Sequence, residues 1–133
     1  MTDDPGEEPL SAGTPRPALT AISVHHAGST VTATALLSLH HRVLRGQAHA
    51  EDRSSAVTLA TLDALGPLLP EGTAIDHSQV LTIAGRQVAI TLVSFPGDSG
   101  RPEVLVGSAL VKGDVEEALA RSVLSALNRR LDI

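Results

Sequence analysis

Hydrophobic and polar residues alternate along the first third of this chain, and the period of the pattern then changes. From Leu19 the segments LTAISVHH and STVTATALLSL show the period of two that is typical of half-buried β-strands. Their apolar face collects Ile22, Val24, Val31, Ala33, Ala35, Leu37 and Leu39. The short segment 27–29 predicts a hairpin turn, in which Gly28 can supply a positive φ. RVLRGQAHA at 42–50 predicts a third strand.

The next segment, SSAVTLATLDALGPLL, has the spacing of a helix. Its apolar positions are Val57, Ala60, Ala64, Leu65 and Leu68. Asp52, Ser54 and Ser55 are the candidate N-caps. Gly66-Pro67 should end or bend the helix, because Pro67 lacks a donor and clashes with the preceding turn. We therefore expect a helix over 55–69.

The second half of the chain repeats this order. Strands are predicted at 73–85, 86–95 and 102–111, and the loop PGDSGRP joins the last two. A helix is predicted over 114–131, with Asp114 as N-cap and Glu117 placed to complete a capping box. Arg129 and Arg130 are expected in its last turn, where a cation favours the helix dipole.

The chain is therefore expected to contain a diverged internal repeat. Gly46 precedes Ala56 by ten residues and Gly107 precedes Ala118 by eleven, and LATLDAL aligns with RSVLSAL. We predict one α+β domain over 18–133, built from βββα repeats at 18–70 and 71–133. The two repeats should form sheet layers with two packed helices related by a pseudo-two-fold axis. Residues 1–17, acidic and rich in Pro, are predicted to be a disordered tail.

Composition narrows the function classes. The chain has no Cys, which excludes disulfides, thiolate metal sites and cysteine nucleophiles. Phe95 is its one aromatic residue and the net charge is −5. The chain therefore offers neither aromatic rings on which bases could stack nor a basic surface for a phosphate backbone, which argues against nucleic-acid binding. No apolar run approaches the ~20 residues that span a bilayer, and the acidic N-terminus is unlike a signal peptide. We expect a cytoplasmic, bacterial protein that binds neither nucleic acid nor membrane.

The order of elements resembles the C-terminal regulatory (allosteric and dimerisation) domain of 2-isopropylmalate synthase, which citramalate synthase shares. In GDVEEALARSVLSALNRR, Asp114, Val115, Glu117 and Ala118 match the family's D-I-x-E-A helix start, and SALNR at 125–129 matches its helix end. GQAHAEDRSSA at 46–56 takes the place of the family's glycine-rich segment, with Gly46 and Ala56 matching. The resemblance covers about residues 19–131 and implies a diverged stand-alone regulatory domain made of two βββα units.

The chain also departs from that family. Ala48, Ala50 and Asp52 replace the family's glycines beyond Gly46, and Gly107-Ser108-Ala109 replaces a G-V-G segment. The resemblance implies that these loops help to bind a feedback amino acid, but the altered residues do not carry leucine or isoleucine sensing over. The catalytic barrel that such a domain regulates is absent from this sequence.

Six histidines invite a metal interpretation, which their spacing does not support. His25-His26 and His40-His41 should lie at opposite ends of a hairpin, ~30 Å apart at ~3.3 Å per residue. His49 could return near the first pair, but no ligand motif accompanies it. We expect solvated histidines, no metal site and no cofactor.

The two predicted helix starts are the best candidates for a ligand site. Free N–H groups and a positive partial charge at a helix N-terminus suit a carboxylate or phosphate. Arg53, Ser54 and Ser55 at the first start, and Lys112, Gly113 and Asp114 at the second, could contribute. The alternative is ordinary capping, in which Asp114 competes with an anion for the same donors.

No catalytic signature accompanies these features. GDSG at 97–100 is similar to a serine-protease motif, but the chain is too short for that fold, and no nucleophile elbow is present. We therefore expect no catalytic residues and a non-catalytic regulatory module. It is predicted to be a homodimer that binds a small molecule, such as an amino acid or another anion, or a protein partner. The alternative is a purely structural interaction module without a ligand.

Overall fold

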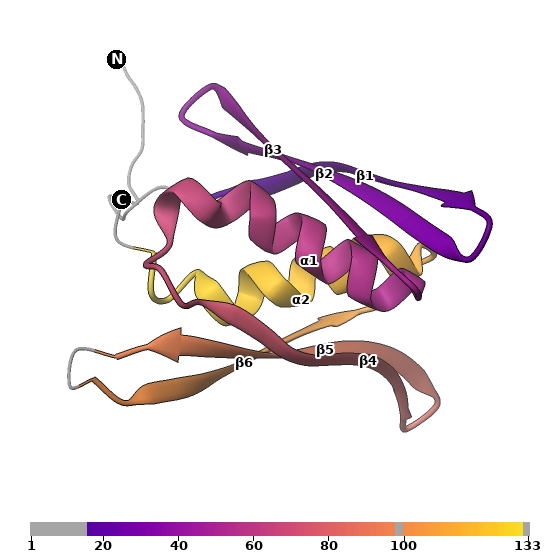
Figure 1. Cartoon of the computed structure of the whole chain (residues 1–133). Helices are drawn as coiled ribbons and strands as arrows, with labels where there is room; N and C mark the ends of the chain where they lie inside the picture. Colours follow the sequence, from indigo (N-terminus) through magenta and orange to yellow (C-terminus); the bar gives the residue numbers. More distant parts are fainter. Residues whose placement is uncertain (1–15, 98–99, 132–133) are drawn as a thin grey trace, which may run out of the picture.

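Two three-stranded antiparallel sheets enclose a pair of helices in the computed structural model, which describes residues 16–97 and 100–131 (Figure 1). The first sheet and its helix are β1 (Ala18–Ala27), β2 (Thr30–Leu39), β3 (Arg42–Ala50) and α1 (Arg53–Leu65), followed by the 3₁₀ turn η1 (Gly66–Leu68). The second sheet and its helix are β4 (Ala74–Ile83), β5 (Arg86–Pro96), β6 (Pro102–Leu110) and α2 (Val115–Leu127). The predicted α+β fold of two βββα units is confirmed.

Alternation places one face of each sheet against the helices. On β2 the buried residues are the predicted set Val31, Ala33, Ala35, Leu37 and Leu39. The helices lie between two sheets and are therefore buried on two sides, which explains why α2 buries eight of its thirteen residues. α1 packs on β2 and β3 and reaches β4, while α2 packs on β5 and β6 and reaches β1. These crossed contacts hold the two repeats together in one core.

The hairpin turns follow the chemistry of their residues. Gly28 adopts φ +63°, as predicted for the turn between β1 and β2. His40 and His41 form the next turn, exposed as predicted, and both have positive φ (53° and 65°). Two left-handed residues are what a two-residue type I′ hairpin turn requires. Non-glycine residues adopt that conformation at a cost, so this turn carries backbone strain.

The helix ends differ from prediction. α1 begins at Arg53 and ends at Leu65, where the predicted Gly66-Pro67 break gives η1. α2 ends at Leu127, and the amide of its C-cap Asn128 makes the last helical bond, to the carbonyl of Leu124 (2.8 Å). The amide of Arg130 then bonds to the carbonyl of Leu127, three residues back (2.8 Å), so the chain leaves the α-helix in a tighter turn. Arg129 and Arg130 therefore do not lie in the last turn of the helix, and that prediction was wrong.

Arg130 instead binds the edge strand of the second sheet. Its guanidinium donates to both carboxylate oxygens of Glu103 in β6, at 2.9 and 3.0 Å. This bidentate contact lowers the pKa of Glu103.

A close approach of strand and helix occurs at the same point in each repeat. A Cβ atom on Gly46 would overlap the backbone of Ala60 and Ala64 in α1. One on Gly107 would overlap the backbone of Ser122 and Ala126 in α2. Neither contact could be relieved by a side-chain rotation, since the overlapping atoms belong to the helix backbone. Glycine is therefore required at both positions for the helix to lie this close to the sheet.

Two further features recur in both repeats. β1 has a bulge at Thr20 and β4 has one at Asp76, between the pairs that flank them. The backbone amide that follows each glycine also contacts a side chain of the helix. Gln47 N donates to Asp63 Oδ2 (2.9 Å), and Ser108 N lies 3.4 Å from Ser125 Oγ. These shared contacts support an internal repeat aligned as the sequence predicted.

A buried polar pair distinguishes the repeats. The hydroxyls of Thr91 and Ser122 lie 2.6 Å apart with both residues fully buried. Ser122 Oγ donates to the carbonyl of Leu119 (2.6 Å), which uses its hydroxyl hydrogen. We infer that Thr91 is the donor to Ser122. The equivalent positions of the first repeat are Ala35 and Ala60, so there the same contact is apolar.

Candidate functional site

Both helix starts are capped by aspartate. Asp52 accepts from the amide and the hydroxyl of Ser55 (2.8 and 2.9 Å), so it is the N-cap of α1 among the three candidates. Asp114 is the N-cap of α2, as predicted, and accepts from the amide of Glu116 (3.0 Å). Glu117 does not complete a capping box in the structure. Its carboxylate pairs with Arg121 one turn along the helix (3.0 Å).

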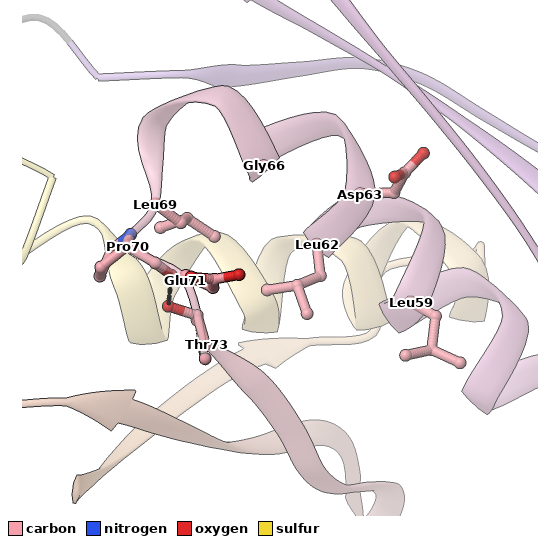
Figure 2. A pocket seen from close by; sticks show the side chains of 9 residues that line it. Leu59, Leu62, Asp63, Gly66, Leu69, Pro70, Glu71 and Thr73 are labelled. Atoms are coloured by element: carbon pink, nitrogen blue, oxygen red, sulfur yellow. Dashed lines mark hydrogen bonds between the residues drawn. The ribbon is translucent and has the colours of Figure 1, made fainter.

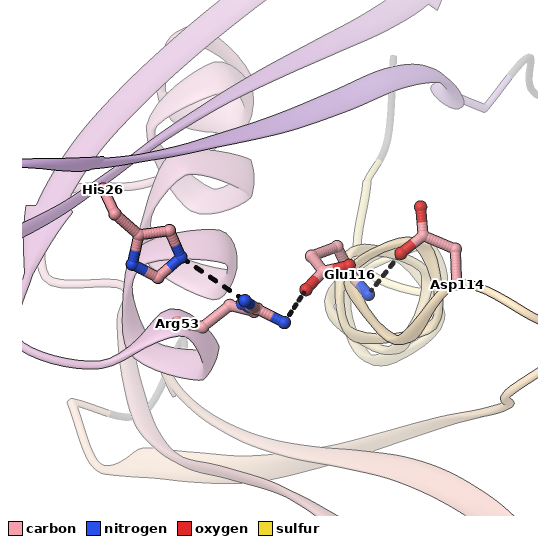
Figure 3. Close-up of polar contacts among 4 residues, drawn as sticks. All are labelled: His26, Arg53, Asp114 and Glu116. Carbon is pink, nitrogen blue, oxygen red and sulfur yellow. Dashed lines mark hydrogen bonds and ion pairs between the residues drawn. The ribbon is translucent and has the colours of Figure 1, made fainter.

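The two helix starts meet across the boundary between the repeats (Figure 3). Arg53, the first residue of α1, extends to Glu116 in the first turn of α2, with 2.9 Å between Nη1 and Oε2. Its Nη2 lies 3.3 Å from Nε2 of His26 at the end of β1. His26, Arg53, Asp114 and Glu116 line a shallow hollow together with Ile22 and Val24. We call these four polar residues the helix-start cluster.

The electrostatics of the cluster centre on its two carboxyl groups. The side-chain hydrogen bond with Asp114 raises the pKa of Glu116, burial adds to this, and Arg53 opposes it. The same hydrogen bond lowers the pKa of Asp114. Glu116 is therefore the carboxyl group that holds a proton to higher pH, and it can donate that proton to the Asp114 carboxylate.

The predicted ligand-site residues separate into different surroundings. Arg53 and Asp114 come together in the helix-start cluster, as described above. Ser55 is taken up in capping, and the carbonyl of Ser54 accepts from the hydroxyl of Thr58 (2.9 Å). Lys112 lines another hollow with residues 85–87, 110 and 111, and Gly113 is exposed at φ +107°. The sequence pattern raised His26 only as a possible metal ligand and did not single out Glu116, because their relevance to a ligand site depends on the two repeats meeting.

This arrangement limits which anion could bind. The first amides of both helices already face the chain's own carboxylates, which occupy the place that an anion would take. Arg53 is the cationic member of the cluster and its side chain is 52% exposed. An incoming carboxylate would have to compete with Glu116 for this guanidinium. Protonation of Glu116 would favour the exchange, because it weakens the ion pair that must be broken.

The histidines are placed largely as predicted. His25 and His49 flank Thr32 from the two neighbouring strands, so His49 does return toward the first pair. Its Nδ1 lies 2.7 Å from the hydroxyl of Thr32. Within residues 16–97 and 100–131, no three His, Asp or Glu side chains are grouped closely enough to hold a metal ion.

A third hollow lies where α1 leads into β4 (Figure 2). Its apolar wall is formed by Leu59, Leu62 and Leu69, and its carboxylates belong to Asp63 and Glu71. The hydroxyl of Thr73 closes the loop by donating to the carbonyl of Pro70 (2.8 Å). No Lys or Arg is among the residues that line it. The hollow was not predicted and does not suit an anion.

The outer faces of the two sheets differ most between the repeats. On the second sheet, successive rows across β4, β5 and β6 consist of Leu81, Val88 and Leu110; Gln79, Ile90 and Ser108; His77, Leu92 and Val106; and Ala74, Ser94 and Val104. We call this surface the apolar outer face. Its edge strand leaves Val104, Val106 and Leu110 between 47% and 59% exposed. The four rows contain no Asp, Glu, Lys or Arg.

The same rows on the first sheet are mostly polar. They consist of His25, Thr32 and His49; Ser23, Thr34 and Gln47; Ala21, Leu36 and Arg45; and Ala18, Ser38 and Val43. Hydrogen bonds join Thr32 to His49 and Thr34 to Gln47. Because the backbone positions are equivalent, the fold does not require an apolar outer face. Its presence on one sheet alone makes that face a candidate binding surface.

Comparison with known proteins identified no relative of this chain. No family model matches the chain, and the comparison with curated proteins gave no match. Among the helices of the described residues, none has the length and apolar character needed to cross a membrane.

Proposed function

We propose that this chain is a non-catalytic protein-interaction module whose working surface is the apolar outer face. The observation that carries the proposal is the row-by-row contrast between the two sheets. Where the first sheet has His25, Thr32 and His49, the second has Leu81, Val88 and Leu110. An apolar patch of this kind on a chain that otherwise places polar residues outward is typical of a protein–protein contact.

Photo-crosslinking in cells that express the chain tests this proposal. The photoreactive residue benzoylphenylalanine would replace Val106 in one variant and Arg45 in another. These positions are equivalent in the two repeats, so strand position and register are matched. We expect covalent adducts from position 106 and few from position 45. Equal adduct yields at the two positions would contradict an interaction role for the apolar outer face.

The resemblance to the regulatory domain of 2-isopropylmalate synthase leads us to propose a regulated form of this function. Two βββα units and a glycine at equivalent strand positions, Gly46 and Gly107, support a distant relationship. In that proposal the chain is a diverged stand-alone domain, and a bound ligand alters its association with a partner. The ligand would shift the equilibrium by the ratio of its affinities for the two states.

The helix-start cluster is the site that we propose for such a ligand. It contacts both repeats through Arg53 and Glu116, so a molecule bound there would sense their relative position. A small carboxylate, such as an amino acid or a 2-oxo acid, would exchange with Glu116 at the guanidinium of Arg53. Thermal melting against a panel of these acids tests this, because a ligand of the folded state raises the melting temperature. A shift that persists in Arg53→Gln would place the ligand elsewhere.

A further inference from the structure

The apolar outer face has features that identify its occupant. The inference drawn from them rests on the interaction role proposed above and concerns only the identity of the partner. The four rows contain no Asp, Glu, Lys or Arg, so a partner that presented charges to this face would bury them without one of these side chains as a counter-ion, which is costly. A neutral apolar surface is the complement that the face accepts, and the chain itself presents one.

The size of the face suits a modest interface. Three strands at ~4.8 Å spacing and seven residues at ~3.3 Å cover about 330 Å² in projection. The accessible area is larger than the projection, because side chains stand out from the sheet. A stable interface buries roughly 800 Å² per partner. The face is therefore small for a stable interface, and we expect a weak complex that forms only at high protein concentration.

The pattern of polar residues on the face is self-complementary. A two-fold axis that lies in the interface, perpendicular to the strands and over Ile90, would place β4 on β4 and β6 on β6 of a second copy. Gln79 would then face the second copy's Gln79, and Ser108 would face its Ser108. Both side chains carry a donor and an acceptor, so each can hydrogen bond to its own copy. The row of Leu92 would cover the row of Val88, and the row of Ser94 would cover Ile83 and Arg86 at the margin of the interface, where the guanidinium can reach solvent.

We propose that the apolar outer face binds a second copy of this chain, giving a two-fold homodimer in which two β4–β5–β6 sheets stack face to face. Stacked sheets pack ~10 Å apart with their strands ~30° from alignment. In this arrangement the first sheets of both copies, with their polar outer faces, point away from the interface. The helix-start clusters also stay outside it, since they lie on the inner side of the sheets.

The test is sedimentation velocity of the full chain from about 1 µM to about 1 mM, a range that covers weak dimers. Val106→Arg is the disrupting variant, because it places a charge over the second copy's Leu110. The equivalent residue of the first repeat is Arg45, so a strand at this position tolerates arginine. The change occurs twice in a two-fold dimer, and we expect the dissociation constant of the dimer to rise about a hundredfold.

Two further variants keep the test decisive. Leu110→His introduces the residue that the first repeat has at position 49, and it should weaken the dimer if Val106→Arg fails to fold. Arg45→Glu changes the polar outer face and should leave the dimer unchanged. A dimer that both Val106→Arg and Leu110→His leave intact would overturn the proposal, as would a dimer lost in Arg45→Glu.

The oligomeric state and the crosslinking yields together distinguish failure of this inference from failure of the proposed function. A chain that stays monomeric over the whole range, yet forms adducts with another protein from position 106, would overturn self-association and leave the interaction role standing. A monomer that gives no more adducts from position 106 than from position 45 would overturn both.

Discussion

Alanine at the two strand glycines tests the packing that defines this fold. The Cβ of Gly46→Ala would stand 2.8 Å from Cα of Ala64 and still closer to two other backbone atoms of α1. Ordinary contacts of a Cβ lie near ~3.5–4 Å, so the helix would have to move away by about 1 Å. That movement would also separate α1 from the buried face of β2.

We expect Gly46→Ala to lower the free energy of unfolding by about 3 kcal/mol, the upper end of the range for overpacked cores. This is a large part of the ~5–15 kcal/mol that stabilises a typical domain. For a chain of this length it corresponds to a fall in melting temperature of roughly 12 °C. Gly107→Ala should cost a similar amount, because its Cβ would meet the backbone of α2 in the same way.

Urea unfolding followed by circular dichroism measures the free energy of unfolding of each variant. Gly66→Ala is the matched control, since no atom lies within 4 Å of its added Cβ and its φ of −47° suits alanine. We expect that control to be neutral or more stable by ~0.4–1 kcal/mol. If Gly46→Ala and Gly107→Ala unfold within 1 kcal/mol of the wild type, the reasoning from close backbone contact is refuted.

Three further predictions address the turn, the buried pair and the cluster. His41→Gly should raise the free energy of unfolding by about 0.5–1 kcal/mol, because glycine relieves the left-handed strain at φ 65°. Ser122→Ala should cost ~1–3 kcal/mol by leaving the Thr91 hydroxyl without its acceptor, whereas Thr91→Val with Ser122→Ala should be nearly neutral, as chemical denaturation can measure. Glu116 has a raised pKa when folded, so the stability it contributes below its ordinary value of 4.5 should be lost as the pH rises through the raised value. Glu116→Gln should abolish that loss, so unfolding measured across pH should show the variant gaining on the wild type as the pH increases.

Each of these has an outcome that contradicts it. A lower melting temperature for His41→Gly would show that the histidine ring contributes more than the turn costs. A double variant at Thr91 and Ser122 that loses as much as Ser122→Ala would mean that the hydroxyl pair is not the source of the effect. A difference between Glu116→Gln and wild type that is independent of pH would remove the basis for a raised pKa.

Local patterns predicted most of the secondary structure. Strand alternation identified the inner face of β2 residue by residue, and the two glycines with their helices established the repeat. These signals are local because side-chain period and turn chemistry depend on neighbours in the sequence. The helix ends were less predictable: α2 ends before Arg129, since the amide of Arg130 bonds to the carbonyl of Leu127, three residues back, instead of continuing the α-helical pattern.

The candidate site was predicted in part. Arg53 and Asp114 were identified as residues at two separate helix starts, but their meeting with His26 and Glu116 depends on how the repeats pack. The apolar outer face was not predicted as a site. Its residues alternate with core residues on β5, and a run such as Val88-Ala89-Ile90 does not show which side is covered.

The amino-acid sequence by itself determined the order of elements, the repeat, the cap of the second helix and a short set of candidate caps for the first, because each depends on interactions within a few residues. The tertiary structure alone decided that the helices lie between the sheets, that both helix starts meet, and that one sheet presents an apolar surface outward. Those outcomes depend on contacts between residues far apart in the chain. Side-chain period reports that a strand has two faces, and only packing shows which of them remains uncovered.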